Sequence, residues 1–154
     1  MSAVPALAEG PTADNRYLTF RLQSEVYGVP VLDVREIIEL QEITPVPRSD
    51  PSVLGVINLR GKVLPLVDMK LRFGMSAFVP TDIAVVIVVE PMGKSPFGVL
   101  VDEVLDVQSV SPNEKTDAPE LSSAIQQAFL AGIGKVRDRL VFLLDLSASD
   151  GEVL

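Results

Sequence analysis

Apolar and polar side chains alternate along short stretches of this chain, which is the pattern of strands that bury one face. Residues 17–22 alternate in this way, a turn-like Gln23-Ser24-Glu25 follows, and an apolar run resumes at 26–31. Similar segments recur through the rest of the chain, at 34–38, 53–59, 63–67, 83–90, 97–101, 104–110 and 140–144. The pattern predicts a mainly β protein.

A hairpin turn and one helix are expected between these strands. Arg60-Gly61-Lys62 separates two apolar segments, and Gly61 is free to take the positive φ of a tight hairpin turn. The polar, proline-bearing stretch 111–119 is expected to be a loop. A helix is expected over 119–130, because Leu121, Ile125 and Phe129 recur every four residues.

Two blocks of the sequence are repeated in the same order. Residues 27–34 resemble 97–104, at an offset of 97 − 27 = 70. Residues 55–68 resemble 132–145, at an offset of 132 − 55 = 77. Nearly equal offsets indicate a duplicated β unit, although chance similarity among valine-rich strands stays an alternative. Each copy is long enough for a small closed barrel of about five strands, which hides its edges.

The predicted organisation is therefore two barrel lobes between short tails. Residues 1–15 are expected to form a disordered tail and 149–154 a second tail. Between them, 16–148 forms one domain of two duplicated lobes, at about 16–78 and 79–148, with exchange of strands between the lobes left open. Such lobes would pack through a shared apolar seam, which is a natural place for a partner to dock.

Composition excludes several classes of function. The chain contains neither Cys nor His, which removes thiolate chemistry, the usual general base near neutral pH and the commonest metal ligand. Its net charge of −8 argues against binding to nucleic acid. The apolar runs are far too short to span a bilayer, and the first residues lack a secretory pattern. We expect a cytoplasmic protein without membrane insertion, cofactor or metal.

The segment 55–68, Gly-Val-Ile-Asn-Leu-Arg-Gly-Lys-Val-Leu-Pro-Leu-Val-Asp, resembles the signature of the CheW family of chemotaxis coupling proteins. Three further blocks are similar to the family in the same order: 17–39, with Tyr-Gly-Val and Val-Arg-Glu-Ile, 97–102, and the Leu-Ala-Gly-Ile-Gly of 130–134. The resemblance covers 16–146. It implies two SH3-like five-stranded β-barrels packed together, with short helices.

The resemblance also implies a function without catalysis. A CheW-like adaptor couples the cytoplasmic tip of a methyl-accepting chemoreceptor to the regulatory domain of the histidine kinase CheA, in an array at the inner membrane. That kinase domain has the same fold, so a detached copy of it is an alternative, which the short length disfavours. Whether the output is flagellar or belongs to another chemosensory pathway stays open.

Arg60 is the first candidate for contact with these partners, together with its neighbours Asn58, Leu59 and Gly61. A guanidinium at a turn reaches outward, and its planar fork suits carboxylates and backbone carbonyls. By resemblance, the matching arginine of the family helps to hold receptor and kinase contacts. The alternatives are a solvated hairpin arginine or an internal salt bridge to Glu36.

Four further candidates lie on neighbouring strands. Val34 and Glu36 belong to the segment that resembles the receptor-facing strand of the family, where an apolar side chain beside a charge suits an interface. The alternative is an ordinary strand with Val34 turned inward. Val99 and Val101 either line the seam between the lobes or belong to the plain core.

Two rival functions come from other classes. Asp68 and Asp145 occupy equivalent positions after apolar strands, and a carboxylate-based hydrolase would bring them together in one pocket. The simpler interpretation of Asp68 is that it caps a short helical turn at 69–73. The second rival is a subunit of a homo-oligomeric β-barrel assembly.

Overall fold

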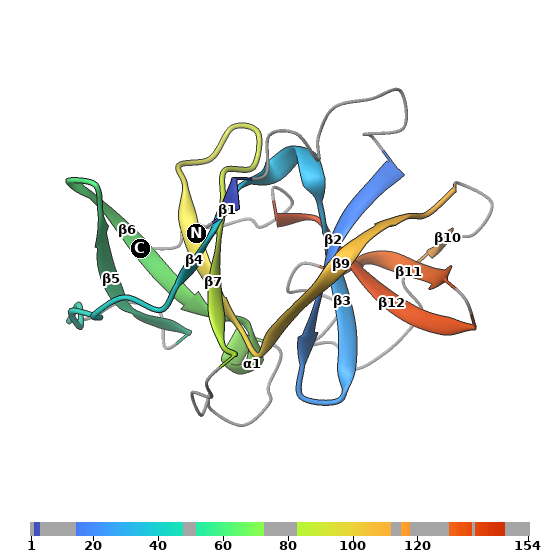
Figure 1. Ribbon diagram of the computed structural model, residues 1–154, viewed down its shortest axis with the longest axis horizontal. Coiled ribbons are helices and arrows are strands. Elements are labelled where there is room, and N and C mark those ends of the chain that lie inside the picture. The colour runs from blue at the N-terminus through green and yellow to red at the C-terminus, as the bar shows by residue number, and fades with distance from the viewer. Residues whose placement is uncertain are drawn as a thin grey trace.

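The computed structural model describes residues 2–3, 15–47, 52–72, 83–111, 115–117, 130–136 and 138–146, which form two six-stranded sheets (Figure 1). The sheet of lobe A runs in the order β1 (Ser2–Ala3), β4 (Val34–Glu39), β7 (Val85–Val89), β8 (Phe97–Val101), β6 (Lys62–Asp68) and β5 (Val53–Leu59). The sheet of lobe B runs β10 (Lys115–Asp117), β11 (Leu130–Val136), β12 (Arg139–Leu144), β3 (Glu25–Pro30), β2 (Arg16–Leu22) and β9 (Glu103–Ser109).

Each lobe thus has five longer strands and one very short edge strand. The helical elements of the described residues are short, with η3 at Val31–Asp33 and α1 at Met69–Arg72. In lobe A the chain after β4 reaches the opposite edge of the sheet, where Thr44 and Val56 exchange backbone hydrogen bonds of 2.9 and 2.8 Å. The predicted mainly β, two-lobed fold is confirmed.

The two lobes are not consecutive stretches of the chain. Lobe A takes β4 to β8, whereas lobe B combines β2 and β3 with β9 to β12. The boundary expected near residue 78 falls between β6 and β7, two elements of the same sheet. The reason is that each copy of the repeat sends its first two longer strands into the sheet of the other copy.

The register of the strands shows the internal symmetry of this exchange. β6 pairs in parallel with β8, and Leu66 lies opposite Gly98. β12 pairs in parallel with β3, and Leu143 lies opposite Gly28. The equivalences are those of the sequence repeat, since 143 − 66 = 77 and 98 − 28 = 70. The two sheets therefore have the same strand order, with β4, β7, β8, β6 and β5 matching β9, β2, β3, β12 and β11.

The largest apolar cluster lies between the lobes and draws on both sheets. Phe20, Tyr27 and Val29 of lobe B pack there with Ile87 and Val99 of lobe A, all of them buried. Two smaller clusters fill the barrels themselves, one around Ile57, Leu66 and Leu100 in lobe A and one around Val26, Val141 and Leu143 in lobe B. β-branched side chains predominate, as a pleated, two-sided core requires.

Some elements differ from the sequence prediction. β11 was not expected as a strand, because its glycines and alanine weaken the apolar pattern, and β10 lies in the expected loop. Ser2–Ala3 of the expected tail pair with Ile37 and Glu36 of β4. The helix expected over 119–130 lies outside the described residues, apart from Leu130 at the start of β11.

At Gly98 of β8, the side chains of Val86 on β7 and Leu66 on β6 leave no room for a further side chain. A Cβ on Gly98 would lie 2.8 Å from Val86 Cγ1 and 3.2 Å from Leu66 Cδ1. At the equivalent Gly28 the nearest atoms are Tyr17 Cβ at 3.2 Å and Val141 Cγ1 at 3.4 Å. Gly98 is therefore the more tightly enclosed member of the pair.

We expect Gly98→Ala to lower the free energy of unfolding by about 1–3 kcal/mol, the usual cost of overpacking a core. Gly28→Ala is the matched control and is expected to cost less, because its neighbours are farther away. Urea unfolding followed by circular dichroism gives both values. An equal or larger loss for Gly28→Ala would contradict this account of the packing.

Candidate functional site

Arg60 is held at the tip of the β5–β6 hairpin by a two-residue turn. Leu59 and Lys62 form the last pair of the ladder, and Arg60 and Gly61 between them have φ of 54° and 84°. Two positive φ values define the type I′ turn that matches the twist of hairpin strands. The Gly61 N–H donates to Asn58 Oδ1 at 3.1 Å, which fixes the turn. The predicted hairpin turn and its positive φ are confirmed.

Arg60 makes a bidentate salt bridge to Glu36 on β4. Its Nη1 lies 2.5 Å from Glu36 Oε2, and its Nη2 donates to Oε1 at 2.8 Å. β4 and β5 stand near opposite edges of the sheet, so the pair joins the two edges where the lobe closes. The Arg60 side chain is 57% exposed and that of Glu36 16%. The guanidinium of Arg60 therefore binds Glu36 within the lobe, while much of the Arg60 side chain still faces solvent.

The salt bridge changes the titration of both groups. The hydrogen bond from Arg60 lowers the pKa of the Glu36 carboxyl, and the attraction of opposite charges adds to this, while burial acts in the other direction. The hydrogen bond to Glu36 raises the pKa of Arg60. Glu36 is therefore a fixed anion at neutral pH and orients the arginine.

The other candidates from the sequence divide into exposed and buried groups. Asn58 and Gly61 are exposed beside Arg60, and Leu59 is half-buried against the core of lobe A. Val34, Val99 and Val101 are buried in the cluster between the lobes. The side chains of these three valines are thus turned away from the surface, and the interpretation that placed Val34 inward matches the structure.

The two aspartates of the rival hydrolase are used differently. Asp68 is fully buried, and its Oδ1 accepts from the Lys70 N–H at 3.0 Å at the start of α1. The predicted capping role is confirmed. Asp145 lies near Asp33, where burial chiefly, and the charge of Asp145 in addition, raise the pKa of the Asp33 carboxyl. Neither Asp68 nor Asp145 lines the cavity described below.

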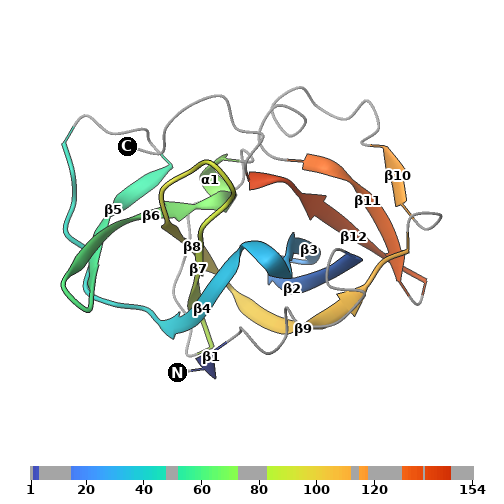
Figure 2. The ribbon, with the colours of Figure 1, turned by 90° about the horizontal axis from the view of Figure 1, so that it is seen from above.

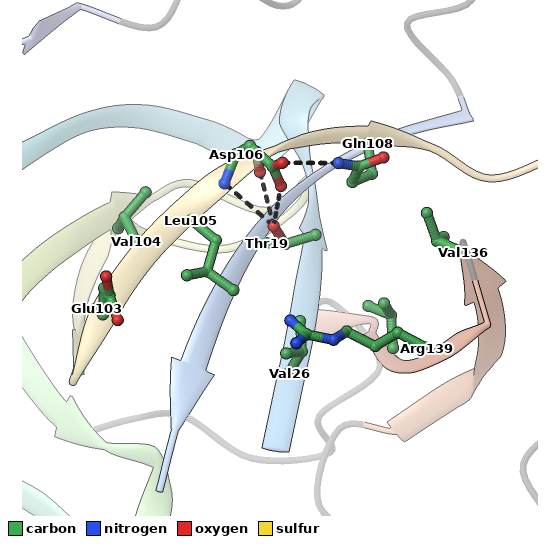
Figure 3. Close-up of a pocket in the computed structure, with 10 residues that line it drawn as sticks. Thr19, Val26, Glu103, Val104, Leu105, Asp106, Gln108, Val136 and Arg139 are labelled. Atoms are coloured by element: carbon green, nitrogen blue, oxygen red, sulfur yellow. Dashed lines mark hydrogen bonds between the residues drawn. The ribbon is translucent and has the colours of Figure 1, made fainter. Parts of the chain in front are cut away.

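A cavity of about 520 Å³ opens in lobe B between β9 and β12 (Figure 3). Figure 3 shows Arg139 reaching toward Val26 on one side, with Asp106 and Gln108 of β9 on the other. The cavity is lined by Thr19, Val26, Glu103, Val104, Leu105, Asp106, Gln108, Val136, Arg139 and Val141. No pattern in the sequence predicts this cavity. The repeat does place Asp106 at the position of Glu36, since 106 − 36 = 70.

Three polar side chains of the cavity, Thr19, Asp106 and Gln108, bond to one another. The Thr19 hydroxyl lies 2.7 Å from Asp106 Oδ1 and accepts from the Asp106 N–H at 3.2 Å. Gln108 Nε2 donates to Asp106 Oδ2 at 2.7 Å. A carboxylate bonded on both oxygens in this way braces β9 against β2. Among the described residues, no three acidic side chains gather in a way that could hold a metal ion, and no helix is long and apolar enough to cross a membrane.

Comparison with known proteins agrees with this two-lobed fold. The family described as the CheW-like domain matches residues 16–149. The chain belongs to the CheW-like family. A probable chemotaxis protein CheW of Rhizobium etli is 37% identical over 146 residues, which cover 95% of this chain and 92% of the relative.

Further CheW proteins are similar at lower sequence identity. The chemotaxis protein CheW of Klebsiella aerogenes is 32% identical over 146 residues, which cover 95% of this chain and 87% of the relative. The crystal structure of the scaffolding protein TtCheW from Thermoanaerobacter tengcongensis superposes with a TM-score of 0.80 at 30% identity. The match covers 92% of this chain and 97% of that protein. The CheW-like fold therefore extends over nearly the whole chain.

The titration of Glu36 tests the geometry of the salt bridge. Because the folded pKa of Glu36 is lowered, its contribution to stability is present above the ordinary pKa of glutamate and is lost as the pH falls through the folded value. In Arg60→Gln we expect the pKa of Glu36 to rise. NMR titration of the side-chain carboxyl carbons measures it, and Lys62→Gln is the control. An unchanged pKa in Arg60→Gln would show that the pair does not form in solution.

Proposed function

We propose that this chain is a non-enzymatic scaffold of a bacterial chemosensory array, which joins the cytoplasmic tips of chemoreceptors to the regulatory domain of the histidine kinase CheA. Membership of the CheW-like family supports a scaffold role in chemotaxis, and the names of the related proteins agree with it. The proposed place of action is the cytoplasm, at receptor arrays on the inner membrane, with no cofactor and no nucleic acid involved.

The observation that carries the proposal is the Arg60–Glu36 pair at the exposed rim of lobe A. A half-exposed guanidinium held in one orientation loses little side-chain entropy when a partner binds it, which favours recognition of carboxylates and backbone carbonyls. Asn58 and Gly61 stand beside it on the same exposed turn. We assign the contact surface to Glu36, Asn58, Arg60 and Gly61.

Exposed apolar side chains extend this surface and occur again in the other lobe. Val63 follows the turn of lobe A and is 63% exposed, and the equivalent Leu140 of lobe B is 54% exposed, where 140 − 63 = 77. Figure 2 shows the two hairpins that carry them, β5–β6 and β11–β12, at opposite ends of the molecule. Two such ends give one scaffold two protein contacts at once, and linked contacts assemble more tightly than either alone.

Val34, Val99 and Val101 are buried away from this surface. They lie in the apolar cluster that fixes the strands against one another, so substitutions there would act through the fold. Leu59 has a similar role in lobe A, since it packs against the barrel core behind the turn. A loss of coupling caused by these residues should therefore come together with a loss of stability.

The charge reversal Arg60→Glu tests the proposed contact. It opposes Glu36 with a like charge at the rim and removes the exposed cation, so we expect at least a tenfold loss of affinity for the CheA regulatory domain and of receptor-dependent kinase activation. Titration calorimetry and a reconstituted kinase assay measure the two effects. Lys62→Glu changes the charge by the same amount two residues away and is expected to lose less.

The reversed pair, Glu36→Arg with Arg60→Glu, separates the internal role of the arginine from the external one. The swap restores an opposite-charge pair, so its thermal unfolding midpoint should return toward that of the parent. If Arg60 contacts a partner directly, binding stays weak in the swapped variant. Parent-like affinity and kinase activation in Arg60→Glu would rule out the proposed contact surface.

A further inference from the structure

From β2 to β9 the chain passes between the lobes at two equivalent places. The first crossing is η3, Val31–Asp33, which leads from β3 of lobe B to β4 of lobe A. The second crossing is Asp102, which leads from β8 of lobe A to β9 of lobe B. The offset of 70 that relates Gly28 to Gly98 also relates Leu32 to Asp102, since 102 − 32 = 70. The two residues are therefore equivalent in the repeat. Equivalent positions of the repeat thus carry an apolar residue at one crossing and a carboxylate at the other.

The carboxylate of Asp102 is bonded to both lobes. Its Oδ1 lies 2.8 Å from Nζ of Lys70, in α1 directly after β6 of lobe A. Its Oδ2 accepts from the backbone N–H of Gln23 at 2.7 Å, in the β2–β3 turn of lobe B. The side chains of Lys70 and Asp102 are only 7% and 9% exposed. Separating a charged pair this deeply buried is costly, because neither charge is well hydrated. Arg21 Nη1 also lies 3.9 Å from Asp102 Oδ2, on the side of lobe B.

The first crossing has contacts of a weaker kind. Leu32 is exposed, and Asp33 uses its backbone carbonyl to accept from the Glu90 N–H at 2.8 Å. The ion pair at this crossing joins Arg35 Nε and Glu90 Oε1 at 2.7 Å, and both side chains are more than a third exposed. Solvent screens such a pair, so it resists displacement far less than a buried pair does.

We propose that the Lys70–Asp102 pair, together with the Gln23 N–H, fixes the angle between lobe A and lobe B, and that Lys70 and Asp102 are positioning residues for the two ends of the molecule. The inference goes beyond the proposed function and does not depend on it. The apolar cluster between the lobes supplies cohesion, which has no preferred direction. The buried pair favours one orientation of the lobes, because charge-assisted hydrogen bonds weaken steeply when their geometry changes.

Distances between the ends of the molecule test this role. The chain contains no Cys, so cysteines introduced at the exposed Lys62 and Lys135 carry spin labels on the two opposite hairpins. Pulsed EPR then gives the distribution of distances between the labels. In Lys70→Met with Asp102→Leu, apolar groups of similar size replace the charges. We expect the urea midpoint to stay equal or rise, and the width of the distance distribution to at least double.

The exposed pair beside the first crossing provides the control, because Arg35 and Glu90 both belong to lobe A and do not join the lobes. Arg35→Gln with Glu90→Gln is expected to leave the width unchanged within error. An unchanged width in the Lys70/Asp102 double variant would overturn the proposal, and so would equal broadening in the control. If circular dichroism shows that the apolar double variant does not fold, Lys70→Gln with Asp102→Asn replaces it, and the same comparison of widths decides.

Discussion

The apolar cluster between the lobes holds the two sheets together. Each copy of the repeat gives two strands to the other sheet, so neither sheet is complete without both copies. The parallel ladders at Gly28 and Gly98 join strands of different copies, and the cluster fills the space between the two sheets. The hairpins that carry Arg60 and Leu140 keep their positions because this apolar cluster holds both barrels together.

Much of the fold could be predicted from the sequence, because alternation of apolar residues and the repeat both report on local geometry. The strands at 53–59 and 97–101 and the turn at Arg60 follow from such patterns. β11 was missed, since Gly132 and Gly134 hide its apolar face. The sheet in which a strand lies depends on contacts far along the chain, which no local pattern records.

The site was predicted less completely than the fold. Arg60 and its internal partner Glu36 could both be predicted from the sequence. A cation at a turn and an acid on a strand can be recognised from local sequence patterns alone. It did not separate exposed valines from buried ones, so Val34, Val99 and Val101 were grouped with a surface from which their side chains are turned away. The cavity beside Asp106 was also missed, because its walls come from strands distant in sequence.

The ladder between β3 and β12 has a consequence for how the protein is made. Val26 pairs with Val141, a separation of 141 − 26 = 115 residues. During synthesis the β2–β3 hairpin therefore keeps part of its apolar surface exposed until β12, the last strand of the described residues, has left the ribosome. Lobe A has no such delay, since its longer strands follow one another from β4 to β8. Chains with such long-range pairing fold slowly and are prone to aggregate before they close.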